Sequence, residues 1–138
     1  MIHGVHHINF LVRDLELARE RFGRLLGLEF APPVELAARG ALTSRARAGT
    51  VWIVLVQPTR ADSVPGRRLA EHGEGLFLIS FAVDDLDAAI DAVTTNGGSF
   101  STPLPRAGLD GWKIIDLAPE LGFGAEVQFC EAPDPPLP

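Results

Sequence analysis

The chain has 138 residues, 46% of them apolar and 22% charged, so it can bury a sizeable core and lacks the composition of a disordered segment. Its net charge of −6 gives no electrostatic reason to bind nucleic acid or an anionic membrane, and no apolar run is long enough for a membrane span. Its one cysteine excludes an internal disulfide, and without an apolar signal core at the N-terminus we expect a cytoplasmic protein.

The first half of the chain predicts a strand, a helix and three further strands. Apolar residues alternate from Ile8 to Val12, as in a half-buried strand, and Asp14 can then cap a helix that Gly27 ends. The apolar stripe of this helix consists of Leu15, Ala18, Phe22 and Leu25. The three strands are expected at residues 28–31, 41–47 and 51–57.

The second half repeats the first. Ile, Phe, Val, Asp, Leu and Ala of residues 8–18 recur in place at residues 79–89, where Asp85 caps a second helix that Gly97 closes. Three more strands are expected at residues 99–102, 112–117 and 125–130. The chain therefore predicts an α+β fold of paired βαβββ modules, about 5–58 and 75–131, in a single domain spanning 1–131. Residues 58–75 are interpreted as a turn-rich connector and residues 132–138 as a flexible tail.

Three segments carry a resemblance to a known family. HINFLVRDLE at residues 7–16, LLGL at 25–28 and GEGLFLISFAVDD at 73–85 resemble the vicinal oxygen chelate superfamily of glyoxalases, bleomycin-resistance proteins and dioxygenases, and within it the methylmalonyl-CoA epimerase group. The resemblance extends from Val5 to Glu131. It implies a curved mixed sheet around a cleft, a small-molecule ligand and a homodimer.

The resemblance also bears on a metal. Family members place four metal ligands on inward-facing strand positions, and at these positions this chain has His7, Val54, Leu78 and Gln128. Valine and leucine have no donor atom, and the glutamine amide is a weak ligand, which leaves His7 as the only matching strong ligand. We therefore predict a site without a cofactor. A divalent metal would be expected only if these strand positions are wrongly assigned.

Three residues are candidates for catalysis. His7 can transfer a proton near neutral pH, although a buried, hydrogen-bonded structural role explains it equally well. Gln128 can orient a carbonyl group. The epimerase resemblance implies a glutamate base near the second and third strands, where Glu35 is the only carboxylate; the alternative is an exposed loop acid.

Four further residues are candidates for ligand binding. Val54 and Leu78 would make the cavity wall apolar, and Trp112 could stack on a planar ligand or simply pack in the core. Glu126 shares a strand face with Gln128 and is either a second acid or a solvated residue at the cleft mouth. The arginines that could hold a small anion, such as a nucleotide-like tail, are Arg39, Arg45, Arg47, Arg60, Arg67 and Arg68.

Two functions follow, from different classes. The first is a metal-independent isomerase, epimerase or lyase that acts beside the carbonyl of an acyl-CoA or a small oxo acid. The second is a non-catalytic protein that sequesters an apolar small molecule, as bleomycin-resistance members do. A metalloenzyme with misassigned ligands is a third interpretation. The enzyme is favoured because the resemblance to the epimerase group extends along the whole chain.

Overall fold

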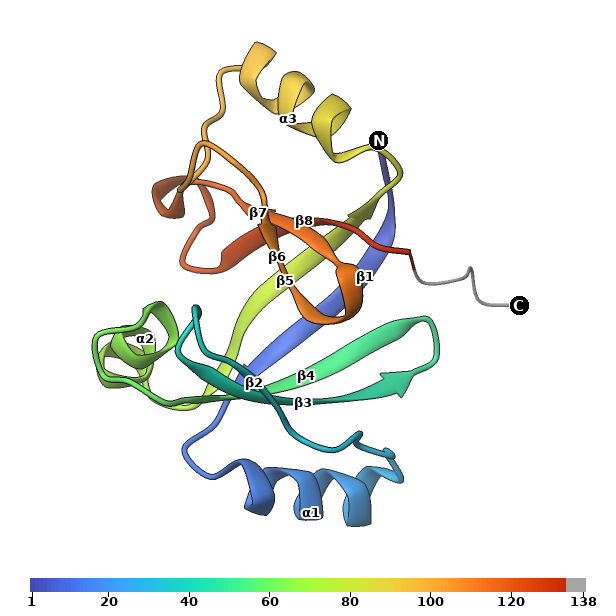
Figure 1. Ribbon diagram of the computed structural model, residues 1–138, viewed down its shortest axis with the longest axis vertical. Coiled ribbons are helices and arrows are strands. Elements are labelled where there is room, and N and C mark those ends of the chain that lie inside the picture. The colour runs from blue at the N-terminus through green and yellow to red at the C-terminus, as the bar shows by residue number, and fades with distance from the viewer. Residues whose placement is uncertain (134–138) are drawn as a thin grey trace. The chain divides into compact units, whose positions relative to one another are not determined.

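The computed structural model describes residues 1–133, which form two compact units (Figure 1). The N-terminal unit is His7–Phe77, and the C-terminal unit combines Met1–His6 with the chain from Leu78 onward. The expected single domain, with modules at 5–58 and 75–131, stays a prediction. Of the expected tail at 132–138, residues 134–138 lie outside the described residues. Within residues 1–133, no helix is long and apolar enough to cross a membrane.

The N-terminal unit is built on four strands in the order β2-β3-β4-β1. Its strands β2, β3 and β4 pair antiparallel, whereas β1 runs parallel to β4. The first residues of β1 belong to the C-terminal unit. The elements in chain order are β1 (Ile2–Leu11), α1 (Leu15–Leu26), β2 (Val34–Leu36), β3 (Ala41–Ala48), β4 (Val51–Pro58) and α2 (Val64–His72).

Helix α1 covers one face of this sheet. Leu15 of the helix is buried with Val12 and Leu55, and Phe10 meets Phe22 edge to face with 5.3 Å between ring centroids. Successive side chains of a strand point to opposite faces. The face away from α1 therefore carries the residues that alternate with this core, among them the partners His7 and Trp52.

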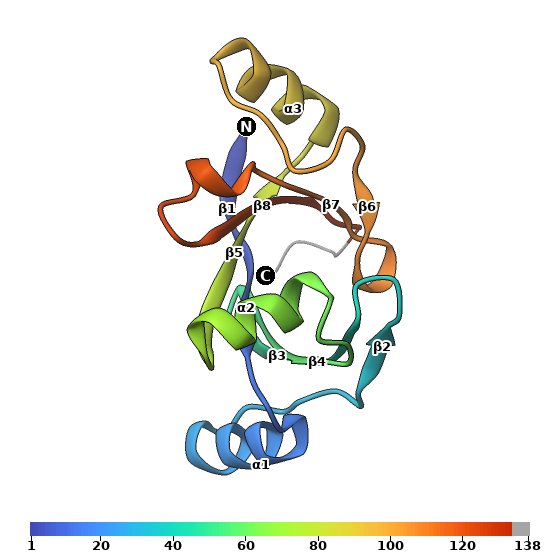
Figure 2. The ribbon, with the colours of Figure 1, turned by 90° about the vertical axis from the view of Figure 1, so that its left-hand side faces the viewer.

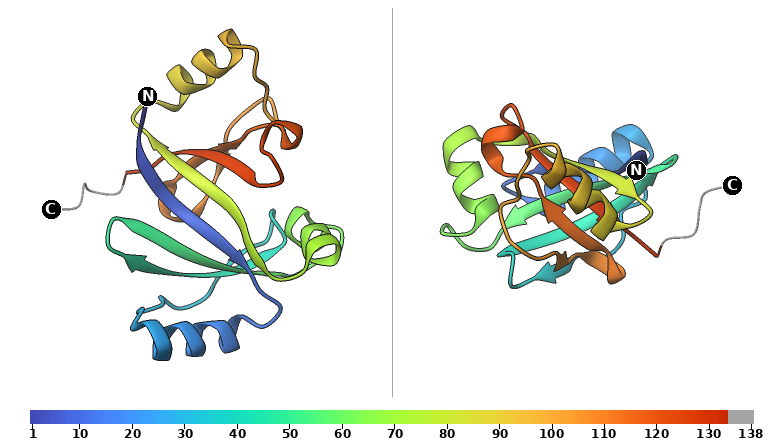
Figure 3. Two further views of the ribbon diagram at one scale, coloured as in Figure 1. Left: turned by 180° about the vertical axis from the view of Figure 1, so that it is seen from behind. Right: turned by 90° about the horizontal axis from the view of Figure 1, so that it is seen from above.

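The C-terminal unit repeats the arrangement with its own four strands, in the order β5-β8-β7-β6. Strand β5 runs parallel to β8, and β7 pairs antiparallel with β8 and β6. Helix α3 packs against β8 (Figure 3), around a core that contains Val83, Ile115 and Phe129. The elements are β5 (Gly75–Val83), α3 (Leu86–Thr95), β6 (Arg106–Ala107), β7 (Lys113–Asp116) and β8 (Glu126–Glu131), with short 3-10 turns at Leu109–Gly111 and Pro119–Leu121.

The predicted α+β fold of paired βαβββ modules is confirmed, but two predicted strands are misplaced. No strand forms at residues 28–31, because Pro32 and Pro33 lack the N–H groups that would extend a ladder. This segment instead makes single bonds to β3, from Ala31 N to Arg45 O at 2.9 Å and from Ser44 Oγ to Ala31 O at 2.6 Å. Residues 99–102 likewise contribute an isolated bridge in place of a strand, and β6 comes later, at Arg106–Ala107.

The expected connector at 58–75 contains a helix, α2, that the turn-rich composition concealed. Ser63 is its N-cap and accepts a bond from Gly66 N at 3.0 Å, with Pro65 in the first turn. Gly66 must be glycine, because an added Cβ would lie 2.1 Å from Arg60 O. Helix α2 packs against β4, as Figure 2 shows for this unit.

The N-terminus of each sheet-covering helix is held by two side chains. Asp14 accepts from Leu17 N at 3.1 Å, and Asp85 accepts from Ala88 N at 3.0 Å. A residue of the neighbouring parallel strand accepts from the first helical N–H. In the N-terminal unit Gln57 Oε1 lies 2.8 Å from Leu15 N, and in the C-terminal unit Glu131 Oε1 lies 3.0 Å from Leu86 N.

Removing an N-cap tests this description. Asp14→Ala and Asp85→Ala are each expected to lower the free energy of unfolding by about 1 kcal/mol, because each leaves a first-turn N–H without its side-chain acceptor. Chemical denaturation measures the loss. Asp91→Ala, inside α3, is the control and should change the free energy of unfolding by less than about 0.5 kcal/mol. Equal losses in cap and control variants would contradict the capping role.

Candidate functional site

The sheet face of the N-terminal unit that points away from α1, called the open face below, carries a buried imidazole and two arginines stacked on a tryptophan. His7 is only 3% exposed and pairs across the sheet with Trp52. The guanidinium carbons of Arg45 and Arg47 lie 4.3 and 4.2 Å from the centroid of the Trp52 ring. Such contacts place cations over the face of an aromatic ring, which attracts them. This face therefore carries an imidazole and positive charge, and Val54 adds a buried apolar patch.

The open face of the C-terminal unit, which points away from α3, carries a row of buried polar residues across three adjacent strands. Ser80 pairs with Gln128, which pairs in turn with Asp116. The three residues are 0%, 2% and 6% exposed. The row ends at Arg106 of β6, which forms an ion pair with Asp116. Polar groups buried this deeply are normally hydrogen-bonded, so each of their atoms must be accounted for.

Two atoms of the row have no hydrogen-bond partner among residues 1–133. Gln128 Nε2 donates to Asp116 Oδ1 at 2.9 Å, while Gln128 Oε1 and Ser80 Oγ are buried without a bond from the described part of the chain. An unpartnered buried oxygen costs about 1–3 kcal/mol, so such groups are usually completed by water or a ligand.

The remaining predicted site residues are divided between the two units. Leu78 is buried and pairs with half-buried Glu126 in the C-terminal unit. Trp112 is 2% exposed and meets the His6 ring edge to face, with 4.5 Å between the ring centroids. It is therefore a core residue as well as a candidate for ligand contact. Glu35 is exposed and pairs with Leu42, on the face covered by α1. These contacts leave the functional roles of Glu35 and Glu126 as predictions.

Strands β1 and β8 carry three side chains of types that bind metals, namely His6, His7 and Cys130. His6 and Cys130 belong to the C-terminal unit, and His7 follows His6 along β1. One ligand atom from each of the three lies within 4.8 Å of the others. Two imidazoles and a thiolate are ligands that zinc and similar divalent ions accept, so this donor set fits a metal in number and in type.

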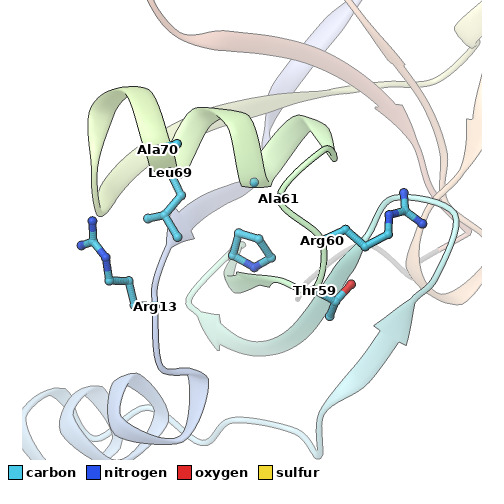
Figure 4. A pocket seen from close by; sticks show the side chains of 8 residues that line it. Arg13, Thr59, Arg60, Ala61, Leu69 and Ala70 are labelled. Atoms are coloured by element: carbon cyan, nitrogen blue, oxygen red, sulfur yellow. The ribbon is translucent and has the colours of Figure 1, made fainter.

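A pocket of about 400 Å³ lies beside α2 in the N-terminal unit (Figure 4). Arg13 and Arg60 supply its charge, and Leu69 lies on its helical wall. Each arginine also contacts a carboxylate, Arg13 that of Glu74 at 3.6 Å and Arg60 that of Asp62 at 3.4 Å. All four side chains are at least half exposed, so these pairs are weak and an anionic ligand could replace a carboxylate.

Comparison with known proteins decides the family. The family model described as the glyoxalase/bleomycin resistance protein/dioxygenase superfamily matches residues 6–115, which is most of the chain. The chain belongs to this superfamily. One relative of this glyoxalase-superfamily protein, the uncharacterized protein YqjC of Bacillus subtilis (strain 168), is 29% identical over 125 residues, covering 91% of this chain and 89% of the relative. The mitochondrial methylmalonyl-CoA epimerase of Bos taurus is 25% identical over 129 residues, covering 93% and 74%.

Solved structures agree with this assignment. A variant of Streptomyces coelicolor methylmalonyl-CoA epimerase, in complex with 2-nitronate-propionyl-CoA, is 25% identical with a TM-score of 0.91, covering 97% of this chain and all of that chain. A methylmalonyl-CoA epimerase in complex with methylmalonyl-CoA and NH4+ is 25% identical with a TM-score of 0.93, covering both chains fully. The predicted resemblance to the methylmalonyl-CoA epimerase group is thereby confirmed.

The prediction that the site has no cofactor is wrong. A related epimerase holds a cation, NH4+, together with its substrate, and this chain brings His6, His7 and Cys130 together as a metal-ligating set. The four family positions from which the prediction was made include neither His6 nor Cys130.

Three residues of the polar row were missed by sequence reasoning. Ser80 stands in an apolar strand, where a small hydroxyl residue packs like alanine, and its alignment with Gln128 could not be known. Asp116 and Arg106 had a usable signal, because an acid inside an apolar strand needs a partner.

The homodimer and the cytoplasmic location stay predictions.

Proposed function

We propose that this protein catalyses proton transfer at the carbon beside the carbonyl of an acyl-CoA, as an isomerase or epimerase of the glyoxalase superfamily. The observation that carries the proposal is the likeness, over 97–100% of the chain, to methylmalonyl-CoA epimerases solved with acyl-CoA ligands. His7 is the proposed acid or base, since a neutral imidazole removes and returns a proton near pH 7.

The charge of the N-terminal unit supports an acyl-CoA substrate. Its pocket beside α2 has two arginines, Arg13 and Arg60, and its open sheet face has Arg45 and Arg47. The phosphates of a CoA moiety are anions that guanidinium groups bind well. These cations allow a chain with a net charge of −6 to bind an anionic ligand locally.

His6, His7 and Cys130 are the residues that would hold a divalent ion; with His7 as a ligand, its imidazole would not also serve as the acid or base. When bound, such an ion supplies a Lewis acid that stabilises negative charge on a carbonyl oxygen. Cobalt titration tests the site directly, since a thiolate ligand gives Co(II) an intense absorption band in the near ultraviolet. We expect the band in the wild type and its loss in Cys130→Ser. A wild type without the band would contradict binding by this set.

Deuterium exchange tests the proposed reaction. Methylmalonyl-CoA is incubated with the purified protein in D2O, and mass spectrometry follows deuterium at the carbon beside the thioester. We expect incorporation faster than in a protein-free control. Because exchange requires only proton removal and return, it reports the proposed chemistry without depending on the stereochemistry of the product. Exchange at the control rate would contradict the proposal.

One observation favours the alternative of a non-catalytic binding protein. Val54 and Leu78 are 3% and 4% exposed, so two sheet positions predicted to contact ligand are apolar and buried. The exchange experiment separates the two functions when calorimetry with the same compound accompanies it. Binding without exchange would support sequestration.

A further inference from the structure

The hydroxyl of Ser80 and the amide oxygen of Gln128 form a pair that the described part of the chain leaves incomplete. Ser80 is fully buried and Gln128 is 2% exposed, and the two residues are register partners on adjacent strands β5 and β8. Partnered residues on neighbouring strands present their side chains on the same face of a sheet. Within residues 1–133, both Ser80 Oγ and Gln128 Oε1 lack a hydrogen bond. Two unmet polar atoms on one face of one sheet point to a shared ligand.

Asp116 fixes which end of the Gln128 amide is presented. Its carboxylate forms an ion pair with Arg106, and an ionised carboxylate only accepts hydrogen bonds. The Gln128 group that faces Asp116 Oδ1 at 2.9 Å must therefore be the donor, Nε2. Rotating the amide by 180° would place two acceptors in contact. The ion pair thus holds Gln128 with its oxygen turned away from Asp116.

The pair consequently selects its ligand by hydrogen-bond type. Gln128 Oε1 can only accept, so the ligand group must donate to it, whereas the Ser80 hydroxyl can donate to an acceptor on that group. A carboxylate or phosphate oxygen has no hydrogen to donate and would leave Gln128 unsatisfied. A hydroxyl, an enol or a primary amide meets both requirements.

We propose that Ser80 and Gln128 form a binding site for one neutral group of the ligand that accepts from Ser80 and donates to Gln128, with Asp116 as the positioning residue. In the proposed reaction, on which this application rests, the group is the thioester oxygen. As a carbonyl it accepts from Ser80 and leaves Gln128 Oε1 without a donor; as the enol, in which one proton has moved from the α-carbon to that oxygen, it also donates to Gln128, so the site favours the enol.

Propionamide and propionate provide matched probes. The two have the same size and shape, but propionamide has a carbonyl and an N–H, whereas propionate has only acceptors. NMR titration of the full chain, followed through the Gln128 side-chain amide signals, should show propionamide binding about tenfold more tightly than propionate. Equal affinities, or no shift of the Gln128 signals by propionamide, would overturn the proposal and leave the pair to water alone.

Two buried serines give matched variants. Ser80→Ala removes a hydroxyl that has no partner within residues 1–133, so it should raise the midpoint of thermal unfolding while weakening propionamide binding about tenfold. Ser44→Ala removes a hydroxyl that donates to Ala31 O at 2.6 Å, so it should lower the midpoint and leave binding unchanged. Unchanged propionamide affinity in Ser80→Ala would refute the assignment, and its raised unfolding midpoint verifies that the variant is folded.

Asp116→Asn tests the positioning role. The new amide can donate to Gln128, so the Gln128 side chain can turn over and present Nε2 to the ligand. We expect the preference for propionamide over propionate to shrink from about tenfold toward parity. An unchanged preference in a folded variant would show that Asp116 does not set the orientation. None of these titrations depends on turnover, so a failure of deuterium exchange would refute the proposed function and leave this site standing.

Discussion

His7→Ala is expected to slow deuterium exchange into methylmalonyl-CoA by at least about a hundredfold, the usual contribution of a positioned acid or base. The side chain is 3% exposed in the wild type, and water, which is a much weaker base than imidazole, cannot take over its role when it is removed. Exchange rates of the variant and the wild type, measured at saturating substrate, give the ratio. His72→Ala is the matched control, because His72 is exposed and lies 3.8 Å from the carboxylate of its neighbour Glu71, and it should exchange at the wild-type rate.

A purely structural His7 would give a different result. Free imidazole added to His7→Ala fits the volume of the deleted ring and is expected to restore part of the exchange rate, with a dependence on the concentration of neutral imidazole. A variant that keeps more than about a tenth of the wild-type rate, or one that imidazole does not rescue, would refute the role of His7 in proton transfer. Cobalt titration of the same variant would then show whether His7 serves as a metal ligand instead.

Arg106→Ala is expected to lower the free energy of unfolding by about 2–3 kcal/mol. The substitution leaves the Asp116 carboxylate, whose side chain is 7% exposed, without its counter-charge. Breaking one side of a buried ion pair typically costs about 3–5 kcal/mol, and the 30% exposure of Arg106 reduces that cost. Urea denaturation measures the effect. Arg24→Ala, which breaks an exposed ion pair with Glu20, should cost less than about 0.5 kcal/mol.

A second substitution shows whether the cost comes from the buried charge. Asp116→Asn in the Arg106→Ala background removes the uncompensated carboxylate, so the double variant should be more stable than Arg106→Ala alone. A double variant that is less stable, with additive losses, would show that the two residues contribute independently and that the ion pair does not hold the row together.

The sequence predicted those parts of the fold that local signals determine. Asp14 and Asp85 each precede a helical stripe, and each is an N-cap in the structure. The sequence also predicted β3 and β4 within one residue at each end, and the apolar run of β4 indicated a buried strand. The repeat of residues 8–18 at 79–89 then supplied the paired architecture, which no single segment reveals.

What the sequence could not predict depends on register and on mixed local signals. Pro65 and Gly66 indicate a turn when counted by composition, yet with Ser63 before them they start α2. The partnership of Ser80 with Gln128 requires the alignment of β5 on β8, two strands joined by more than forty residues of chain. Hydrophobic periodicity places each residue on a face but does not align one strand on another.

The side-chain bonds to the first N–H of α1 and α3 make the two ends of each helix unequal in dynamics. Leu15 N and Leu86 N are held by residues of parallel strands, so opening either bond requires the strand side chain to move as well. The opposite ends finish at Gly27 and Asn96, where backbone N–H groups bond to carbonyls of the same helix. Local unfolding should therefore begin at the C-terminal turns, and the amides of Leu15 and Leu86 should exchange hydrogen far more slowly than unbonded first-turn amides do. Each helix can then lose its last turn while its first turn stays attached to the sheet.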